Sequence, residues 1–282
     1  MLGDVVGTLA CPHCGADLAA ADNTLRCAAG HTFDVAKQGY VNLLTGTGSV
    51  GTADTAAMVA ARVDFLGAGH YDPIGDALAA ASAGAVPGAL VDVGAGTGHH
   101  LARVLDALPE RHGLALDISK YALRRAARAH PRMGAAVCDA WRPLPVRTGA
   151  AARVLNVFAP RNPPELHRIL AAEGTLLVAA PTAGHLAELV PALGLLQVDP
   201  DKQERIDVKL APWFTVRERH THTFTMALDH TAIATVVAMG PSAWHTDPGR
   251  LRSAIAELAN PLAVTASVTV SAYDPVRRLP NP

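Results

Sequence analysis

Three of the four cysteines lie near the start of the chain, at a spacing typical of a metal site. Residues 11–31 read CPHCGADLAAADNTLRCAAGH, with two residues inside the first Cys pair and three between the third Cys and the His. A two-residue gap lets both thiolates face one ion, and three Cys with one His complete a closed tetrahedral zinc site. We therefore predict structural Zn²⁺ held by Cys11, Cys14, Cys27 and His31. His13 is the substitute ligand, and a chance cluster is the alternative.

A glycine-rich turn follows the apolar run at residues 89–93. The segment VDVGAGTG places Asp92 two positions before Gly94, and Gly96 and Gly98 complete a G-x-G-x-G pattern. Glycines between a strand and a helix let the backbone approach a ligand closely. The dinucleotide fingerprint has its third glycine one residue later. The spacing is therefore typical of S-adenosylmethionine (SAM) methyltransferases, with an NAD-type site as the alternative.

Acidic residues end the next two apolar runs. Asp117 lies at the end of the second run and Asp139 at the end of the third. At those places one carboxylate can accept hydrogen bonds from both ribose hydroxyls, and the other can accept from the adenine amine. The alternatives are a helix-capping role for Asp117, which precedes Ser119, and a turn role for Asp139. Together with the glycine turn, the two acids predict a SAM site.

These residues require a repeated strand–helix fold to bring them together. Apolar runs at residues 89–93, 113–118, 135–139, 152–158 and 175–180 alternate with helical stretches at 100–108 and 120–130. This order predicts an α/β, class I, Rossmann-like domain with a mostly parallel sheet, whose ligands bind at the carboxyl ends of the strands. The runs at 221–228 and 265–272 are expected to be late antiparallel strands. Asn162, followed by two prolines, is expected to cap a helix.

The 282 residues divide into a small and a large part. We expect a zinc-binding module at 1–45, a Gly/Thr-rich linker at 46–55 and a methyltransferase domain at 56–282. Half of the residues are hydrophobic, 17% are charged and the net charge is −1, which argues against a disordered chain and against DNA as a partner. No apolar run suits a membrane span, so we expect no membrane partner and a cytoplasmic protein with reduced thiols.

Several motifs together carry a family resemblance. They are the zinc module with its tail FDVAKQGYVNLL, GHYDP (69–73), VDVGAGTG, NVFAP (156–160) and AGHLAEL (183–189). Over nearly its whole length the chain resembles the 23S rRNA guanine-N1 methyltransferases, most closely the actinobacterial branch that includes the tylosin-resistance methyltransferase. The resemblance implies a target guanine in a 23S rRNA hairpin lining the peptide exit tunnel. It also implies a homodimer and, in that branch, resistance to macrolides. It also places Tyr71, Gly96, Thr97 and His185 on SAM-contacting positions.

Guanine N1 lies on the Watson–Crick edge, so a paired guanine must leave its stack before it can react. An aromatic platform would hold it, and Phe158 and Trp244 are our candidates, with a role as core aromatics as the alternative. N1 also carries a proton that must leave. A carboxylate, a backbone carbonyl or water could accept it, and the sequence identifies no catalytic residue for this step.

Charge is distributed unevenly along the chain. Residues 1–50 carry two basic and four acidic residues, a net −2, whereas residues 111–132 carry six basic residues and one acid, a net +5. Within the second segment Arg124, Arg125 and Arg128 are candidates for RNA backbone contacts, with a solvated helix face as the alternative.

Two other classes of function share some of these features. A SAM methyltransferase of a small molecule would use the same turn and acids, and activity on a free metabolite would identify it. A non-catalytic zinc-ribbon RNA-binding adaptor would fail to bind SAM.

Overall fold

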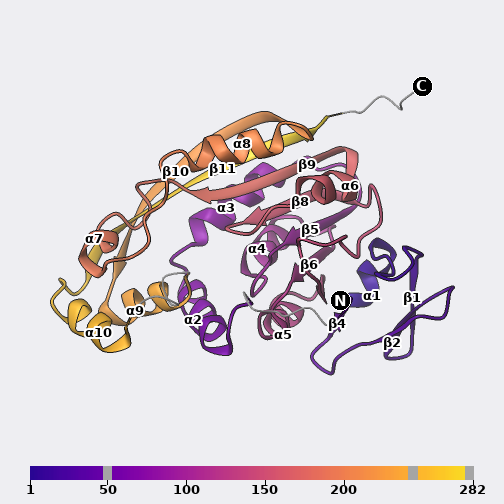
Figure 1. Ribbon diagram of the computed structural model, residues 1–282, viewed down its shortest axis with the longest axis horizontal. Coiled ribbons are helices and arrows are strands. Elements are labelled where there is room, and N and C mark those ends of the chain that lie inside the picture. Colours follow the sequence, from indigo (N-terminus) through magenta and orange to yellow (C-terminus); the bar gives the residue numbers. More distant parts are fainter. Residues whose placement is uncertain (47–52, 241–246, 277–282) are drawn as a thin grey trace.

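Eight strands form one large sheet, and most of them are the short apolar runs of the sequence (Figure 1). The structure is a computed structural model that describes residues 1–46, 53–240 and 247–276. The five strands expected between residues 89 and 180 are confirmed, as are the two late strands. Across the sheet the order is β10 (Phe214–Leu228), β11 (Leu262–Pro275), β9 (Leu170–Pro181), β8 (Ala151–Val157), β5 (Ala89–Val93), β6 (Gly113–Asp117), β7 (Met133–Val137) and β4 (Tyr40–Asn42).

The sheet is parallel except at one side. Strands β4, β7, β6, β5, β8 and β9 pair in parallel, whereas β11 is antiparallel to both β9 and β10. The predicted α/β class with a mostly parallel sheet is therefore confirmed. The chain changes its direction of travel across the sheet between β5 and β8. In open α/β sheets the crevice beyond the carboxyl ends of such neighbouring strands is where ligands bind.

Helices cover both faces because successive strand residues point to opposite sides of the sheet. Leu114 and Leu116 join one buried cluster, and Ala115 between them joins the other. One face carries α3 (Asp72–Ser82), α4 (His99–Ala107) and α5 (Lys120–Ala129), with α2 (Ala56–Gly67) and α9 (His230–Ala238) beyond them. The other carries α1 (Leu2–Val5), α6 (Pro163–Ile169) and α8 (Lys202–Leu210). Helix α10 (Pro248–Ala256) contacts α9 and α7 (Leu189–Leu193), far from the N-terminal module (Figure 1).

Among the described residues, no helix combines the length and the apolar composition that crossing a bilayer would require.

The N-terminal module is a three-stranded antiparallel sheet made of β1 (Leu18–Ala21), β2 (Thr24–Cys27) and β3 (Thr32–Asp34). Helix α1 and the 3₁₀ turn η1 (Val6–Thr8) precede it. The tail that follows β3 contributes β4, which pairs in parallel with β7 as an edge strand of the large sheet. The domain boundaries stay predictions, and β4 belongs to the large sheet by its hydrogen bonds. Residues 47–52 of the expected linker lie outside the described residues.

Helix α6 begins directly after Asn162, as predicted, with two prolines in its first turn. The expected capping role of the Asn162 side chain is wrong, because this side chain makes no capping hydrogen bond. Proline has no N–H group, so the first two helical positions offer no donor for a cap. The next N–H, that of Glu165, donates to the Asn162 backbone carbonyl at 3.1 Å.

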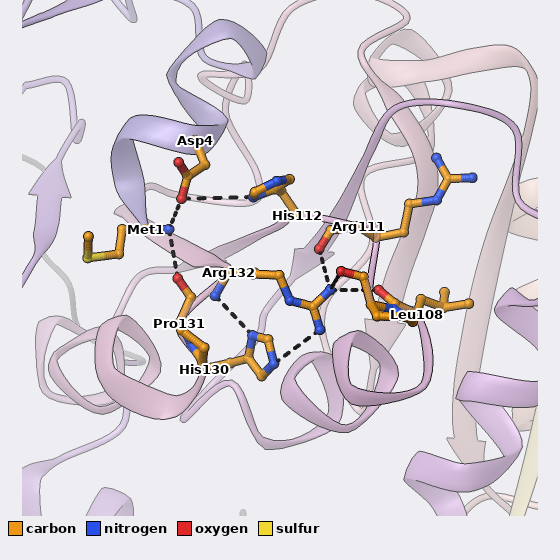
Figure 2. Close-up of polar contacts among 9 residues, drawn as sticks. Met1, Asp4, Leu108, Arg111, His112, His130, Pro131 and Arg132 are labelled. Atoms are coloured by element: carbon orange, nitrogen blue, oxygen red, sulfur yellow. Dashed lines mark hydrogen bonds and ion pairs between the residues drawn. The ribbon is translucent and has the colours of Figure 1, made fainter.

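Polar contacts fasten α1 to the loops before β6 and β7 (Figure 2). The Met1 nitrogen donates to the Pro131 carbonyl at 2.8 Å, and Asp4 lies 3.9 Å from His112 Nδ1. The Arg132 guanidinium donates to the Leu108 carbonyl at 2.8 Å and to the Arg111 carbonyl at 3.0 Å. These contacts join the start of the N-terminal module to the amino ends of the parallel strands.

Candidate functional site

A cavity of about 840 Å³ opens at the carboxyl ends of β5, β6, β7 and β8. Gly98 lies at the N-terminus of α4 beside it. Trp244 lies outside the described residues. The other predicted cofactor- and base-contacting residues come from distant parts of the sequence and line the cavity together. They are Tyr71, Asp92, Gly94, Gly96, Thr97, Asp117, Asp139, Phe158 and His185.

The turn after β5 requires glycine for reasons of space as well as backbone conformation. Gly94 has φ +83°, and a Cβ there would lie 2.4 Å from the side chain of Ala159, two residues after β8. Gly98 has φ +78°, and a Cβ there would lie 2.9 Å from the Met133 sulfur. Both backbone conformations are ones that side chains disfavour. The turn and the residues that follow β8 therefore lie close together where both line the cavity.

Asp92 is a fully buried acid at the end of β5, with its Oδ1 unpaired among the described residues. Burial raises the pKa of this carboxyl to about 8, with a further contribution from the negative charge of Asp117. A buried carboxylate without a partner is costly unless a cation or donor arrives. The cationic methionyl end of SAM is such a group, so the residues fit the cofactor on this ground.

The other two acids already make local hydrogen bonds. Asp117 accepts from the backbone N–H groups of Gly96 and Ser119, each at 2.8 Å, and burial raises the pKa of its carboxyl. Asp139 accepts from the Trp141 N–H at 2.9 Å. Asp139 therefore has the turn role that the sequence left open, whereas Ser119 and not Asp117 caps α5. Each carboxylate oxygen has two lone pairs, so these bonds leave acceptor capacity toward the cavity.

A hydrogen-bonded chain holds the tyrosine and histidine that only the resemblance had placed at the site. The Ser267 N–H donates to His185 Nδ1 at 3.2 Å, and His185 Nε2 lies 2.9 Å from the Tyr71 hydroxyl oxygen. Because Nδ1 accepts, Nε2 carries the hydrogen and donates to Tyr71. Burial lowers the pKa of His185 to about 4, so the ring stays neutral. The phenol hydrogen of Tyr71 is then free to donate to a ligand.

Phe158 occupies an unusual position after β8. Its backbone has φ 52°, in the left-handed region, and its side chain is 41% exposed. The buried Asn156 amide fixes this turn by donating to the Val93 carbonyl at 3.0 Å and to the Pro160 carbonyl at 2.9 Å. The Phe158 ring lies 6.1 Å from the His185 ring and 6.3 Å from the Tyr71 ring. Left-handed backbone in a bulky residue is costly and is concentrated at functional sites.

The four predicted zinc ligands come together in the N-terminal module. Their ligand atoms all lie within 4.8 Å of one another. Cys14 Sγ lies 3.7 Å from Cys27 Sγ, which in turn lies 3.4 Å from His31 Nδ1. A tetrahedron with zinc–sulfur bonds of about 2.3 Å has edges of about 3.8 Å, so the set fits zinc. His13 is not in this cluster, and its ring stacks on Phe33 at 5.8 Å.

The three candidate RNA-binding arginines line one shallow depression of about 320 Å³ on α5. Gln38 from the N-terminal module, the half-exposed Tyr121 and three residues of α2 (Ala56, Val59 and Ala60) also line it. Other basic residues of the +5 segment (residues 111–132) are engaged in hydrogen bonds within the protein. Arg132 donates to backbone carbonyls (Figure 2), and Arg111 donates to the carbonyls of Gly88 and Ala85. The basic surface is therefore smaller than the sequence suggested. We call Arg124, Arg125 and Arg128 the α5 arginines.

Sequence reasoning missed three residues that line the cavity. Trp141 is 60% exposed and carries Lys209 Nζ at 4.7 Å from its ring centroid. Arg161 and Lys202 also line the cavity. Arg161 directly follows the NVFAP motif, and this position could have identified it as a site residue. Lys202 lies too far along the chain for any spacing argument.

The strand order, the glycine turn and the acids at successive strand ends define a class I SAM-dependent methyltransferase joined to a zinc-binding module. The comparisons agree with this class. A zinc-ribbon family model described as "RlmA, N-terminal" matches residues 9–45. The crystal structure of YcgJ from Bacillus subtilis aligns with a TM-score of 0.51 at 11% identity, covering 72% of this chain and 98% of that chain, which shows the fold alone.

Full-length relatives identify the family. The 23S rRNA (guanine(748)-N(1))-methyltransferase of Streptomyces fradiae is 55% identical, covering 98% of this chain and 100% of the relative. A relative from Micromonospora griseorubida is 52% identical over 97% of this chain and 99% of its own length. The chain belongs to the 23S rRNA (guanine-N1)-methyltransferase family.

Proposed function

We propose that this chain methylates N1 of a guanine in a 23S rRNA hairpin lining the exit tunnel, at the position equivalent to the 748 named for the Streptomyces fradiae relative. The observation that supports this most is full-length similarity at 55% identity combined with an intact cavity. An rRNA substrate implies action in the cytoplasm. The test is methylation of deproteinised 23S rRNA by purified protein, with the product mapped by a reverse-transcription stop. Methylation of a free metabolite instead, or no SAM binding, would contradict it.

We infer a division of labour within the cavity. SAM, when bound, supplies an electrophilic methyl carbon on its sulfonium. Asp92 and Tyr71 lie where they can hold its methionyl end, and Asp117 and Asp139 lie where they can accept from its ribose and adenine. Gly94, Gly96, Thr97 and Gly98 shape the turn against which it lies, and His185 orients Tyr71. Positioning of the two reactants supplies most of the acceleration in such a transfer.

We also propose that Cys11, Cys14, Cys27 and His31 hold the zinc ion and that the zinc ribbon and the α5 arginines contact RNA. A homodimer, which the resemblance implies, would bring two such surfaces to one hairpin. Light scattering of the purified protein tests this assembly. Expression in a tylosin-sensitive host tests the proposed macrolide resistance, since a methylated guanine in the tunnel should lower drug susceptibility.

Phe158 is proposed as the stacking platform for the flipped guanine, because its ring is exposed in the cavity between Tyr71 and His185. Stacking on an aromatic side chain contributes about 1–3 kcal/mol per base. Phe158→Leu should therefore lower kcat/KM for rRNA by about 10- to 100-fold while SAM affinity is unchanged. Phe158→Tyr keeps the ring and should retain most of the rate. Unchanged methylation by folded Phe158→Leu would remove the stacking role.

The α5 arginines are expected to contribute affinity without sequence preference. None of the three forms an ion pair with a described residue, and Arg124 lies 5.6 Å from the Tyr121 ring. The double variant Arg124→Glu/Arg125→Glu should weaken RNA binding by at least about tenfold and reduce the salt slope by about two. The matched control is Arg250→Glu/Arg252→Glu, because both residues are exposed on α10. Equal affinities and slopes in both variants would argue against an RNA-binding role.

A further inference from the structure

One side of the cavity, formed by the loop after β8 and the start of α8, carries two cations that form no ion pair with any acid among the described residues. Arg161 follows Pro160, and Lys202 is the first residue of α8. Both side chains are partly buried, and Arg161 Nε is buried with no hydrogen-bond partner among the described residues. Burial lowers the pKa of both groups, and the charge of Arg161 lowers the pKa of Lys202 further. Two like charges are therefore held near each other inside the cavity.

The acidic residues on α8 and just before it are either paired with other side chains or lie outside the cavity. Asp199, which lines the same side, pairs with Arg205. Asp207 accepts from the Tyr273 hydroxyl at 2.7 Å and pairs with Arg219 at 2.6 Å. Asp201 and Glu204 are exposed and do not line the cavity. Positive charge is thus left unmatched, and a buried cation without a partner is costly unless an anion binds there.

The cavity is consequently divided in charge. Its cofactor side carries the buried carboxyl of Asp92 and the partly buried carboxyl of Asp117, which suit the net positive charge of SAM. Its other side carries Arg161 and Lys202. Lys202 is near enough to lower the pKa of His185, whose ring lies 6.1 Å from Phe158, and Arg161 leaves the same turn as Phe158. The cations therefore adjoin the proposed platform for the base.

We propose that Arg161 and Lys202 bind the backbone phosphate of the guanosine that is methylated. This inference rests on the proposed rRNA substrate. A guanidinium can contact two phosphate oxygens at once, and the Lys202 ammonium adds a point charge. Both cations would bind an oxyanion of either origin. The carboxylate of SAM is the other oxyanion that could bind there, and the experiment separates it from the RNA phosphate.

The test uses Arg161→Gln and Lys202→Gln in the full chain. An RNA hairpin bearing the target guanine is the probe, with binding followed by anisotropy across a salt series and SAM binding followed by calorimetry. Each charge-assisted contact should contribute about 10- to 100-fold, so RNA affinity and kcat/KM should fall by that factor and the salt slope by about one. SAM affinity should stay within about twofold of wild type.

Matched variants make the result decisive. Arg252→Gln, an exposed arginine on α10, should change nothing, and Arg161→Lys should retain part of the affinity. If SAM affinity falls and RNA affinity does not, the cations hold the cofactor carboxylate and the proposal is wrong. Unchanged binding of both ligands also overturns it. Should Arg161→Gln fail to fold, Lys202→Gln alone decides. Failure of wild-type protein to methylate rRNA would instead overturn the proposed function, and this inference with it.

Discussion

Cys27→Ser is expected to abolish binding of zinc and to lower rRNA methylation by roughly a hundredfold or more, while SAM affinity changes little. The three strands of the ribbon have three or four residues each, and few of their side chains are buried. Such a module depends on its metal for folding. The SAM cavity is built from the large sheet and its helices, so it should survive loss of the ribbon. Zinc content, calorimetry with SAM and rRNA methylation would be measured on the same preparation.

His13→Ala is the matched control, because His13 lies beside the cluster without joining it. It should keep one zinc per chain and most of the methylation activity. A Cys27→Ser protein that retains both zinc and full activity would show that another residue completes the site or that the ribbon is dispensable. A loss of SAM binding in parallel would show that the ribbon supports the large sheet through β4 and β7.

The strands, and the strand ends that carry the site residues, could be predicted from the sequence because buried parallel strands are continuous apolar runs. Asp92, Asp117 and Asp139 could be placed at one edge from the topology of such sheets alone. The role of the tail after β3 could not be predicted in this way. β4 is three residues long, and the strand of the large sheet that it pairs with is β7, more than ninety residues later. Short edge strands are chosen by tertiary pairing and leave little local signal.

The features of the site that could not be predicted depend on contacts between segments far apart in the sequence. Tyr71 and His185 are 114 residues apart and meet through one hydrogen bond, which only the family resemblance had anticipated. The left-handed backbone of Phe158 depends on the Asn156 amide reaching the Val93 carbonyl on β5. Composition and periodicity contain neither fact. The site is therefore predictable where it follows from strand order and unpredictable where loops converge on it.

Asp92→Asn is expected to weaken SAM binding by about 10- to 100-fold at pH 7.5 and to remove the pH dependence of that binding. In the free protein the Asp92 carboxyl, with its pKa raised to about 8, is mostly protonated below that pH. Binding of the methionyl ammonium favours the ionised carboxylate, so a proton must leave. The wild-type Kd should therefore fall by up to tenfold for each unit of rise between pH 6 and 7.5. The amide keeps the shape of the side chain and has no proton to release.

The same substitution should stabilise the protein without ligand. A carboxyl whose pKa is raised from 3.8 in the unfolded chain to about 8 in the folded one lowers stability progressively as the pH rises between these values. Asp92→Asn removes that loss, so its melting temperature should exceed that of wild type at pH 8 and match it near pH 4. Asp64→Asn, on the exposed side of α2, is the control and should follow wild type in both measurements. A pH-dependent Kd that persists in Asp92→Asn would mean that another group releases the proton, with Asp117 as the nearest candidate, because its charge is what raises the pKa of Asp92 beyond the effect of burial.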